Sequence, residues 1–487
     1  MSALSSISGM LWLPGAAVLA AGAAALLVDA FGRPGLGTAL VGAAAVLASV
    51  LCAASASDGT IAEVVPGILG GGGLAGAAAV IYLLSAASLV TGLRNVPGSR
   101  RGGVAALIGV AAVASQALAG AADALVMAIA LETIAIASFG IVAAGRGKAS
   151  REVAIRYFVQ ASVAVGLLVF GLAGIVGLGG GATGYNELVQ AMSSAPAAAA
   201  SVLGVLLLAA LAFKAGAFPF HSWVPDVYGV LEPEAAVFVA GAPKIAAVLA
   251  LWLLFARSVW AGEAFRNVSV AIGVAAAASI IVGNFGALKQ RDLGRMLGYS
   301  AIAQVGYALI GVSSRAVGTP LLVVSYAAAV AVAFGCLAAL RSEAGDQATL
   351  ESVAGVALKR PVLAGTTAVA MLSLTGVPLT VGFLGKLFVF YGAVSGGWTW
   401  LALIGAIGSV VSFGYYGRVI QAMYFAEPIA APDETSQSGA APFDSASPSP
   451  TGRARVWPFA ILAAMLVAAG TVPLVTGFEW LLRLFTV

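Results

Sequence analysis

The chain has 487 residues, of which 61% are hydrophobic and only 9% are charged, and its mean hydropathy is +1.03. Soluble proteins contain about 25% charged residues, so this composition excludes a soluble globular protein. The 24 Lys and Arg residues are nearly balanced by 20 Asp and Glu, and the longest basic run is the pair Arg100–Arg101, which argues against nucleic-acid binding.

Apolar stretches of about 18 residues or more, long enough to cross a bilayer, recur along the whole chain. No Lys or Arg precedes the first stretch, which is atypical of a cleaved signal peptide, so we predict that it is retained. The sequence predicts an all-α integral membrane protein with about 14 transmembrane helices, near residues 11–30, 38–57, 74–93, 102–120, 122–144, 153–177, 201–220, 234–256, 267–288, 294–313, 319–340, 362–391, 397–420 and 456–478.

The distribution of Lys and Arg predicts the orientation of these spans. If the N-terminus lies outside, 17 of the basic residues fall in inside connections, 4 fall in outside connections and 3 lie within spans. Membrane proteins place their basic loops on the cytoplasmic side. The sequence therefore predicts a multi-pass protein with its N-terminus outside.

Two of the predicted helices are interrupted. The stretch 213–228, FKAGAFPFHSWVPDVY, contains Pro219 and Pro225, and Pro378 follows a glycine in the twelfth span. Proline removes a backbone donor, and a broken helix is tolerated in a membrane only where protein or water satisfies the freed groups. The two breaks are five spans apart, so the spans run in opposite directions, which indicates inverted repeats.

This pattern divides the chain into five predicted parts. A three-helix segment over residues 1–100 precedes two inverted five-helix repeats, 101–260 and 261–425, each with a discontinuous helix. Residues 426–455 are rich in Pro, Ser, Asp and Glu and predict a flexible cytoplasmic linker, and residues 456–487 predict a C-terminal helix.

Four ionisable residues lie inside predicted spans: Glu132, Lys214, Lys244 and Lys386. A charge at the centre of a membrane helix costs about 2.5–3.5 kcal/mol, so such residues are usually functional. A carboxylate and an amine within about 4–6 Å keep each other charged, which makes Glu132 and Lys214 the natural pair. A purely structural ion pair remains the alternative. Because three lysines outnumber one carboxylate, we predict that these four residues form a chain of proton-exchange sites.

Other polar residues in the spans are candidate relays. His221 titrates near neutral pH and is predicted to pass protons between Lys214 and Lys244; alternatively, it only hydrogen-bonds within the helix break. Four further side chains are predicted to line a water path, with helix packing as the alternative: Ser300, Gln304, Tyr307 and Tyr326.

No cofactor motif accompanies these residues. Cys52 and Cys336 lie in separate apolar segments without a CxxC partner, which excludes an iron–sulfur or zinc cluster made by this chain alone. Gly71, Gly73 and Gly76 match a dinucleotide fingerprint, but they open a membrane span and follow no predicted strand. We therefore predict neither a metal site nor a nucleotide site.

Five motifs together resemble a known family. They are FKAGAFPFHSWVPDVY at 213–228, APKIAA at 242–247, NFGALKQRDLGRMLGYSAIAQVGY at 284–307, SLTGVPLTVGFLGKLFVFY at 373–391 and FGYYGRVIQAMYF at 413–425. Their order and spacing resemble the antiporter-like membrane subunits of respiratory complex I, the NADH–quinone oxidoreductase. The N type, equivalent to the mitochondrial ND-two type, is the most similar.

The resemblance implies a function for the four ionisable residues inside the predicted spans. Glu132, Lys214, Lys244 and Lys386 match the family's proton-translocating residues, and quinone reduction elsewhere in the complex drives the protons. It implies a non-redox subunit of a translocase, with flavin and iron–sulfur clusters on partner subunits and no cofactor in this chain. It also implies other membrane subunits of complex I as partners, including sister antiporter-like subunits, and a bacterial-type inner membrane.

The chain departs from the family pattern at several positions. Glu232 and Glu234 stand where the family has an Ala-Pro-Thr-Pro run; they are predicted either to collect protons at the cytoplasmic mouth or merely to be solvated. Gln304 occupies a position where histidine is common, which puts a histidine relay there in doubt. Arg156 stands where relatives carry lysine, and because arginine does not release its proton, we predict a fixed charge.

Two other functions remain open on the sequence. The same helices and the Glu/Lys pair also occur in subunits of multi-subunit cation/proton antiporters. A passive assembly scaffold is the alternative from another class, and it predicts normal proton pumping after Lys214 and Lys386 are replaced.

Overall fold

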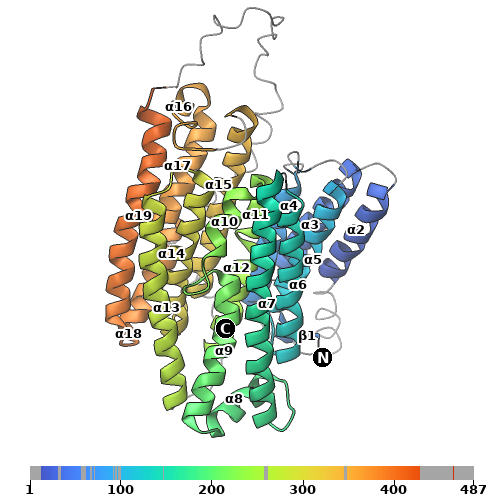
Figure 1. Cartoon of the computed structure of the whole chain (residues 1–487), viewed down its shortest axis with the longest axis vertical. Coiled ribbons are helices and arrows are strands. Elements are labelled where there is room, and N and C mark those ends of the chain that lie inside the picture. Colours follow the sequence, from blue (N-terminus) through green and yellow to red (C-terminus); the bar gives the residue numbers. More distant parts are fainter. Residues whose placement is uncertain are drawn as a thin grey trace, which may run out of the picture.

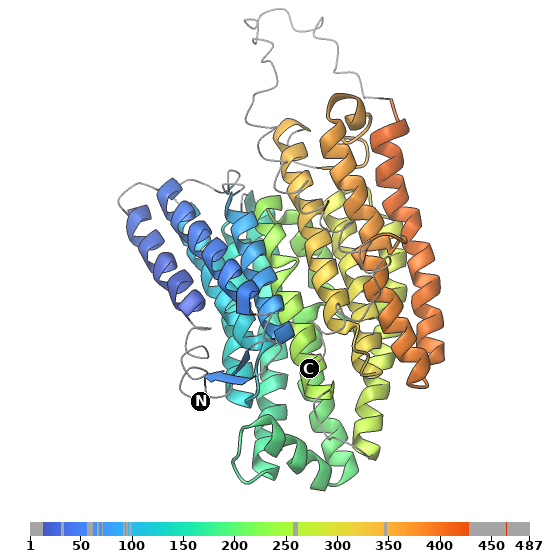
Figure 2. The same cartoon turned by 180° about the vertical axis from the view of Figure 1, so that it is seen from behind.

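The chain forms an elongated bundle of helices that run roughly along its longest axis (Figure 1; Figure 2 shows it from behind). The computed structural model describes residues 13–30, 34–55, 62–65, 68–70, 72–90, 93, 96, 100–145, 147–256, 262–344, 348–427 and 464. The predicted linker 426–455 and C-terminal helix 456–487 therefore lie outside the described residues, except for Ala426, Glu427 and Ala464.

The predicted spans up to 397–420 each coincide with described helices. In the first half these are α2 (Leu13–Ala30), α3 (Pro34–Ser55), α4 (Gly72–Val90), α5 (Arg101–Ala119), α6 (Ala124–Ala143), α7 (Gly147–Leu178), α9 (Ala197–Ala215) with α10 (Trp223–Val230), and α11 (Pro233–Val239) with α12 (Ala242–Ala256). In the second half they are α13 (Glu263–Leu288), α14 (Leu293–Ser313), α15 (Thr319–Ala344), α17 (Pro361–Thr375) with α18 (Val381–Ser395), and α19 (Thr399–Phe425).

Within the described part, 10 helices are long and apolar enough to cross a membrane, and the shorter apolar helices are Leu13–Val28, Leu74–Val90, Pro361–Thr375 and Val381–Ser395. The chain is thus a multi-pass helical membrane protein.

Short elements between the spans were not predicted. An antiparallel hairpin joins β1 (Ala62–Val65) to β2 (Ile68–Gly70), and the backbone N–H of Leu69 donates to the Gly120 carbonyl at 2.7 Å. Two short helices, α8 (Tyr185–Ser194) and α16 (Val356–Lys359), lie at opposite ends of the bundle (Figure 1). Apolar periodicity locates spans of a bilayer's length, so elements this short escape it.

Both predicted helix breaks are present, and they share one local structure. α9 ends at Gly216 and α17 ends at Gly376, with φ values of 83° and 85°. The amides of Gly216 and Ala217 both donate to the Ala212 carbonyl, at 2.9 and 2.8 Å, and the two amides that end α17 share the Leu372 carbonyl in the same way. This glycine-terminated helix end satisfies the last carbonyls while the chain turns away from the helix axis.

A third interruption was not predicted. The expected continuous span 234–256 is divided at Ala240–Gly241 into α11 and α12, which are buried from Pro233 to Phe255. A Cβ atom on Gly241 would lie 2.7 Å from the Leu84 side chain, so the backbone passes close to α4. The Ala240 carbonyl accepts hydrogen bonds from the hydroxyls of Tyr228 and Tyr326, at 3.5 and 3.3 Å. The break therefore places a polar backbone group inside the bundle.

The loop after α15 is tied to the connection between α13 and α14. Leu293 N–H donates to the Ala348 carbonyl at 2.9 Å, and Arg291 pairs with Glu351 at 3.5 Å. Hydrogen bonds from its own backbone amide and from the Thr349 hydroxyl lower the pKa of the Glu351 carboxyl. These contacts hold the start of α14, which carries several of the predicted site residues.

Candidate proton-translocation site

Lys214 lies at the end of α9 in a cage of neutral groups. Its side chain is 2% exposed. The amine donates to the Tyr157 hydroxyl at 3.0 Å, the Ser138 hydroxyl at 3.1 Å and the Ile134 carbonyl at 3.3 Å. Hydroxyl and carbonyl oxygens stabilise an ammonium group without fixing its protonation state as a carboxylate would.

Glu132 lies on α6, on the same helix as Ser138, but does not pair directly with Lys214. Neither side chain belongs to an ion pair within 4.0 Å in the described part of the chain. Glu132 is partly exposed, and it still lies within electrostatic range of Lys214 and Tyr157. The neutral groups on α6 and α7 occupy the hydrogen-bonding positions of the amine, so the pairing of Glu132 with Lys214 within about 4–6 Å stays a prediction.

Lys244, on α12, meets the first helix break and is 1% exposed. Its amine donates to the Ala215 carbonyl at 2.5 Å, next to the turn at Gly216. The rings of Trp223 and Tyr228 face the amine, with centroids 5.5 and 5.8 Å away. A helix C-terminus carries a partial negative charge, and aromatic faces attract cations, so the break itself stabilises this ammonium.

The surroundings of Lys214 and Lys244 are joined by aromatic rings. Tyr157, which binds Lys214, contacts Trp223 in a tilted arrangement with ring centroids 4.9 Å apart, and Trp223 faces Lys244. His221 does not lie in this contact: its ring stacks on Phe218 at 5.4 Å, and its buried Nδ1 atom has no hydrogen-bond partner among the described residues. The structure thus brings the two lysines together without His221, whose relay role stays a prediction.

Lys386, on α18, meets the second helix break in the same manner. It is 4% exposed, and its amine donates to the carbonyls of Leu374 and Thr375, at 3.0 and 2.8 Å, and to the Ser409 hydroxyl at 2.8 Å. The Tyr307 ring covers the amine with its centroid 4.4 Å away. Lys244 and Lys386 therefore occupy equivalent surroundings, the carbonyl end of an interrupted helix beside an aromatic face.

The predicted polar residues of α14 gather around Lys386. Besides Tyr307, Gln304 donates from Nε2 to the Leu374 carbonyl at 2.6 Å, which also accepts from Lys386. Ser300 lies farther along and accepts from the Tyr416 hydroxyl at 2.9 Å. All three α14 side chains are buried.

Sequence reasoning missed several polar partners in this region, on α13 and α19. Their signal was present as polar and aromatic residues inside two apolar spans: Asn284, Ser409, Tyr415 and Tyr416. All but Ser409 lie within motifs that the resemblance already used. Their partners lie on other helices, so their significance depends on packing that periodicity does not report.

Glu232 and Glu234 lie where α11 begins. They are 9% and 4% exposed, and the backbone carbonyl of Glu234 accepts from the Ser88 hydroxyl at 2.6 Å. The alternative that they are merely solvated is therefore wrong. Burial of two carboxylates requires compensating interactions, which leaves proton collection as the prediction for them.

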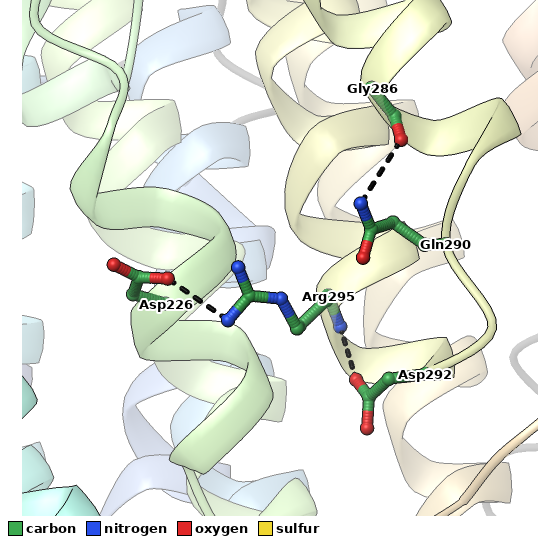
Figure 3. Close-up of polar contacts among 5 residues, drawn as sticks. All are labelled: Asp226, Gly286, Gln290, Asp292 and Arg295. Atoms are coloured by element: carbon green, nitrogen blue, oxygen red, sulfur yellow. Dashed lines mark hydrogen bonds and ion pairs between the residues drawn. The ribbon is translucent and has the colours of Figure 1, made fainter.

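The second half of the first interrupted helix, α10, forms an ion pair with α14 and packs closely on it. Asp226 on α10 pairs with Arg295 on α14 at 3.0 Å, while the Asp292 carboxylate caps α14 by accepting from the Arg295 amide at 2.6 Å (Figure 3). Beside this ion pair the backbones of α10 and α14 lie close together. A Cβ atom on Gly298 would lie only 2.7 Å from Pro225 Cα. α10 thus packs on the second half of the chain although it follows α9 in sequence.

We expect the ion pair to contribute little to stability. The side chains of Asp226 and Arg295 are 37% and 41% exposed, and exposed pairs contribute about 0–1 kcal/mol. Asp226→Asn should therefore shift the melting temperature of the detergent-solubilised protein by only a few degrees. The double variant that also carries Arg295→Gln should melt at almost the same temperature as Asp226→Asn alone. A loss of folding in the single variant would show that the contact matters more than its exposure indicates.

Comparison with known proteins places this architecture in a family. Residues 121–412 match the family described as NADH:quinone oxidoreductase/Mrp antiporter, TM. NADH-quinone oxidoreductase subunit N of Caulobacter sp. (strain K31) is 36% identical over 377 residues, 74% of each chain. The protein of that name from Xanthomonas euvesicatoria is 33% identical over 365 residues, 72% of this chain and 74% of the relative. For Hirschia baltica the identity is 36% over 299 residues, and the alignment covers 62% of the relative's length.

Solved structures agree with this placement. A chain of respiratory complex I from Thermus thermophilus, solved with bound aureothin, superposes with a TM-score of 0.75 at 27% identity, covering 94% of this chain and 97% of that one. A chain of the Mrp complex from Dietzia sp. DQ12-45-1b superposes with a TM-score of 0.82 at 19% identity, covering 99% and 96%. The second likeness shows the fold alone.

Proposed function

Because this chain belongs to the NADH:quinone oxidoreductase/Mrp antiporter transmembrane family, we propose that it is the N-type membrane subunit of a proton-translocating NADH–quinone oxidoreductase. The relatives that align over about three quarters of their length carry that name. One observation carries the proposal of proton transfer: three buried amines, on α9, α12 and α18, lie in cages of neutral oxygens and aromatic rings.

In this proposal protons move through Glu132, Lys214, Lys244 and Lys386, and the chain itself performs no redox chemistry. An amine held by carbonyl and hydroxyl oxygens can bind and release one proton, since its partners are neutral in both states. Flavin and iron–sulfur clusters belong to partner subunits in this proposal, and quinone is reduced elsewhere in the complex. Four residues are proposed as relays or water-path residues around the lysines: His221, Ser300, Gln304 and Tyr307.

The proposal includes a topology. The matching glycine-terminated breaks after α9 and α17 support two inverted repeats with one discontinuous helix each. With the predicted helix at 456–478, the chain has fourteen spans, its N-terminus outside, in an inner membrane of bacterial type. Its partners are the other membrane subunits of the complex, including sister antiporter-like subunits, and the lipid bilayer.

Purification in mild detergent from the native membrane tests the assignment. We expect the tagged chain to co-purify with flavin and iron–sulfur absorbance and with NADH–quinone reductase activity. A preparation with only membrane proteins and with cation flux that needs no redox substrate would instead assign the chain to a multi-subunit cation/proton antiporter, the alternative that the family description includes. The buried lysines would keep their roles in that case, but the energy source would change.

Glu132→Gln should slow proton translocation without abolishing it. The carboxylate acts on Lys214 from outside ion-pair distance and is partly exposed. An electrostatic effect of this kind contributes about 0.5–1 kcal/mol, so we expect about a twofold to fivefold fall in proton-pumping rate. The measurement is acidification of proteoliposomes per NADH oxidised, with the exposed Glu263→Gln as control. Equal rates in both variants would remove Glu132 from the proposed chain.

A further inference from the structure

Trp223 is the first residue of α10, and its side chain folds back onto the end of α9. The indole N–H donates to the Phe213 carbonyl at 3.0 Å, and the same carbonyl accepts from the Gly216 amide at the end of α9, also at 3.0 Å. A carbonyl oxygen has two lone pairs, so it can accept both hydrogen bonds. The indole thereby joins the two halves of the interrupted helix beside Lys214, which follows Phe213 in sequence.

The ring of Trp223 contacts the surroundings of both lysines. Its centroid lies 4.9 Å from that of Tyr157, whose hydroxyl accepts from Lys214 at 3.0 Å. The Phe213 ring packs on both, with centroids 5.7 Å from Trp223 and 5.9 Å from Tyr157. The Lys244 amine lies 5.5 Å from the centroid of the Trp223 ring. One buried side chain therefore touches the residue that holds Lys214 and faces Lys244.

The Lys244 amine is closely surrounded at this position. It donates to the Ala215 carbonyl, and the Tyr228 ring is a second aromatic face at 5.8 Å. A Cβ atom on Gly216 would lie 2.9 Å from Lys244 Nζ and 3.8 Å from Trp223 Cζ2, so the turn, the amine and the indole lie against one another. The amine is thus held between the carbonyl end of α9 and two aromatic rings of α10.

Indole combines two properties that these contacts use. Its face attracts a cation more strongly than the face of any other aromatic side chain, and its N–H is a donor that phenylalanine lacks. The attraction to the face requires the positive charge, so the contact favours the protonated form of Lys244 over the neutral amine. The indole therefore fixes the helix break and also stabilises a proton on Lys244.

We propose that Trp223 is a positioning residue for proton exchange between Lys214 and Lys244. Its N–H holds the start of α10 on the end of α9, and its ring face stabilises the proton that reaches Lys244. The inference rests on the proposed proton translocation and adds to it a residue that neither binds nor releases the transferred proton. Without the indole face, the ammonium of Lys244 would keep only the Ala215 carbonyl and the Tyr228 ring, and transfer to Lys244 would become less favourable.

The test weakens the ring face while keeping its shape. Fluorine withdraws negative charge from the face of an indole and is only slightly larger than hydrogen, so tryptophans with an increasing number of ring fluorines at position 223 grade the cation–π contact. In the intact complex reconstituted into proteoliposomes, we expect the proton-pumping rate to fall with each added fluorine, by on the order of tenfold across the series. A constant rate across the series overturns the role of the ring face.

Trp252, on the same helix as Lys244, is the matched control. It is 3% exposed, and its N–H donates to the Ala316 carbonyl at 3.0 Å, as that of Trp223 does to Phe213. Among the described residues, no lysine or arginine faces its ring. Fluorination also strengthens the N–H donor, but it does so at both positions, so a fall confined to position 223 identifies the ring face. An equal fall in both series would indicate a packing defect and contradict the proposal.

Substitutions separate the N–H from the face. Trp223→Phe keeps an aromatic face and loses the donor, so it should lower the melting temperature by about as much as Trp252→Phe. Trp223→Leu also loses the face and should pump several-fold more slowly than Trp223→Phe, whereas equal rates would remove the face from the proposal. If Trp223→Leu does not assemble, the fluorinated series decides. A wild-type complex that reduces quinone without acidifying the vesicles would refute the proposed function itself, independently of Trp223.

Discussion

Replacement of Lys386 by methionine or by arginine should abolish most proton translocation while the complex still assembles. Methionine has nearly the length of lysine but no N–H group, and arginine keeps the charge but does not release its proton. Loss of a proton-transferring group typically slows transfer on the order of 100-fold or more. The measurement is the number of protons translocated per quinone reduced, with the exposed Lys289→Met as control.

The pair of variants separates two roles for the lysine. If Lys386 only neutralises the carbonyl ends at Leu374 and Thr375, arginine should substitute for it and methionine should destabilise the protein, because each carbonyl loses a hydrogen bond from a charged donor, which contributes about 1.5–3 kcal/mol. Normal pumping by Lys386→Arg would therefore contradict proton exchange at this site. Normal pumping by both variants would support a passive scaffold.

Apolar runs and prolines in the sequence located the spans and the two main helix breaks, because bilayer thickness and the loss of backbone donors impose those features on any chain. The break at Ala240–Gly241 was not predicted, since no proline marks it and it depends on the close approach to Leu84. The sequence likewise identified Lys214, Lys244 and Lys386 as buried, which their exposed fractions confirm.

The partners of the lysines could not be predicted with the same rules. Charge complementarity suggested Glu132 for Lys214, but the amine binds hydroxyl and carbonyl groups instead. Lys244 and Lys386 donate to backbone carbonyls, which every residue has, so no side-chain pattern in the sequence predicts these contacts. Such contacts become visible only when the direction of each helix end is known.

Gly216→Ala should have the second large effect, because this position combines two constraints. Its φ of 83° lies in the left-handed region, which costs a residue with a Cβ atom about 1–2 kcal/mol. The added methyl group would also lie 2.5 Å from Val224 Cγ2 and 2.9 Å from Lys244 Nζ. We expect Lys244 to be displaced from the Ala215 carbonyl, with strongly reduced pumping and a lower melting temperature of the purified complex.

Gly180→Ala separates the two constraints. Gly180 also has a left-handed φ, of 69°, but a Cβ atom there would meet nothing within 4 Å. It should show the backbone cost alone, a lowered melting temperature with normal pumping. If Gly216→Ala pumps like Gly180→Ala, the position of Lys244 at the helix break does not matter for transport.

The second helix break allows an independent test of the same idea, since a Cβ atom on Gly376 would lie 2.9 Å from Lys386 Cδ. Loss of pumping in Gly376→Ala and Gly216→Ala but not in Gly180→Ala would tie function to the lysine at each break.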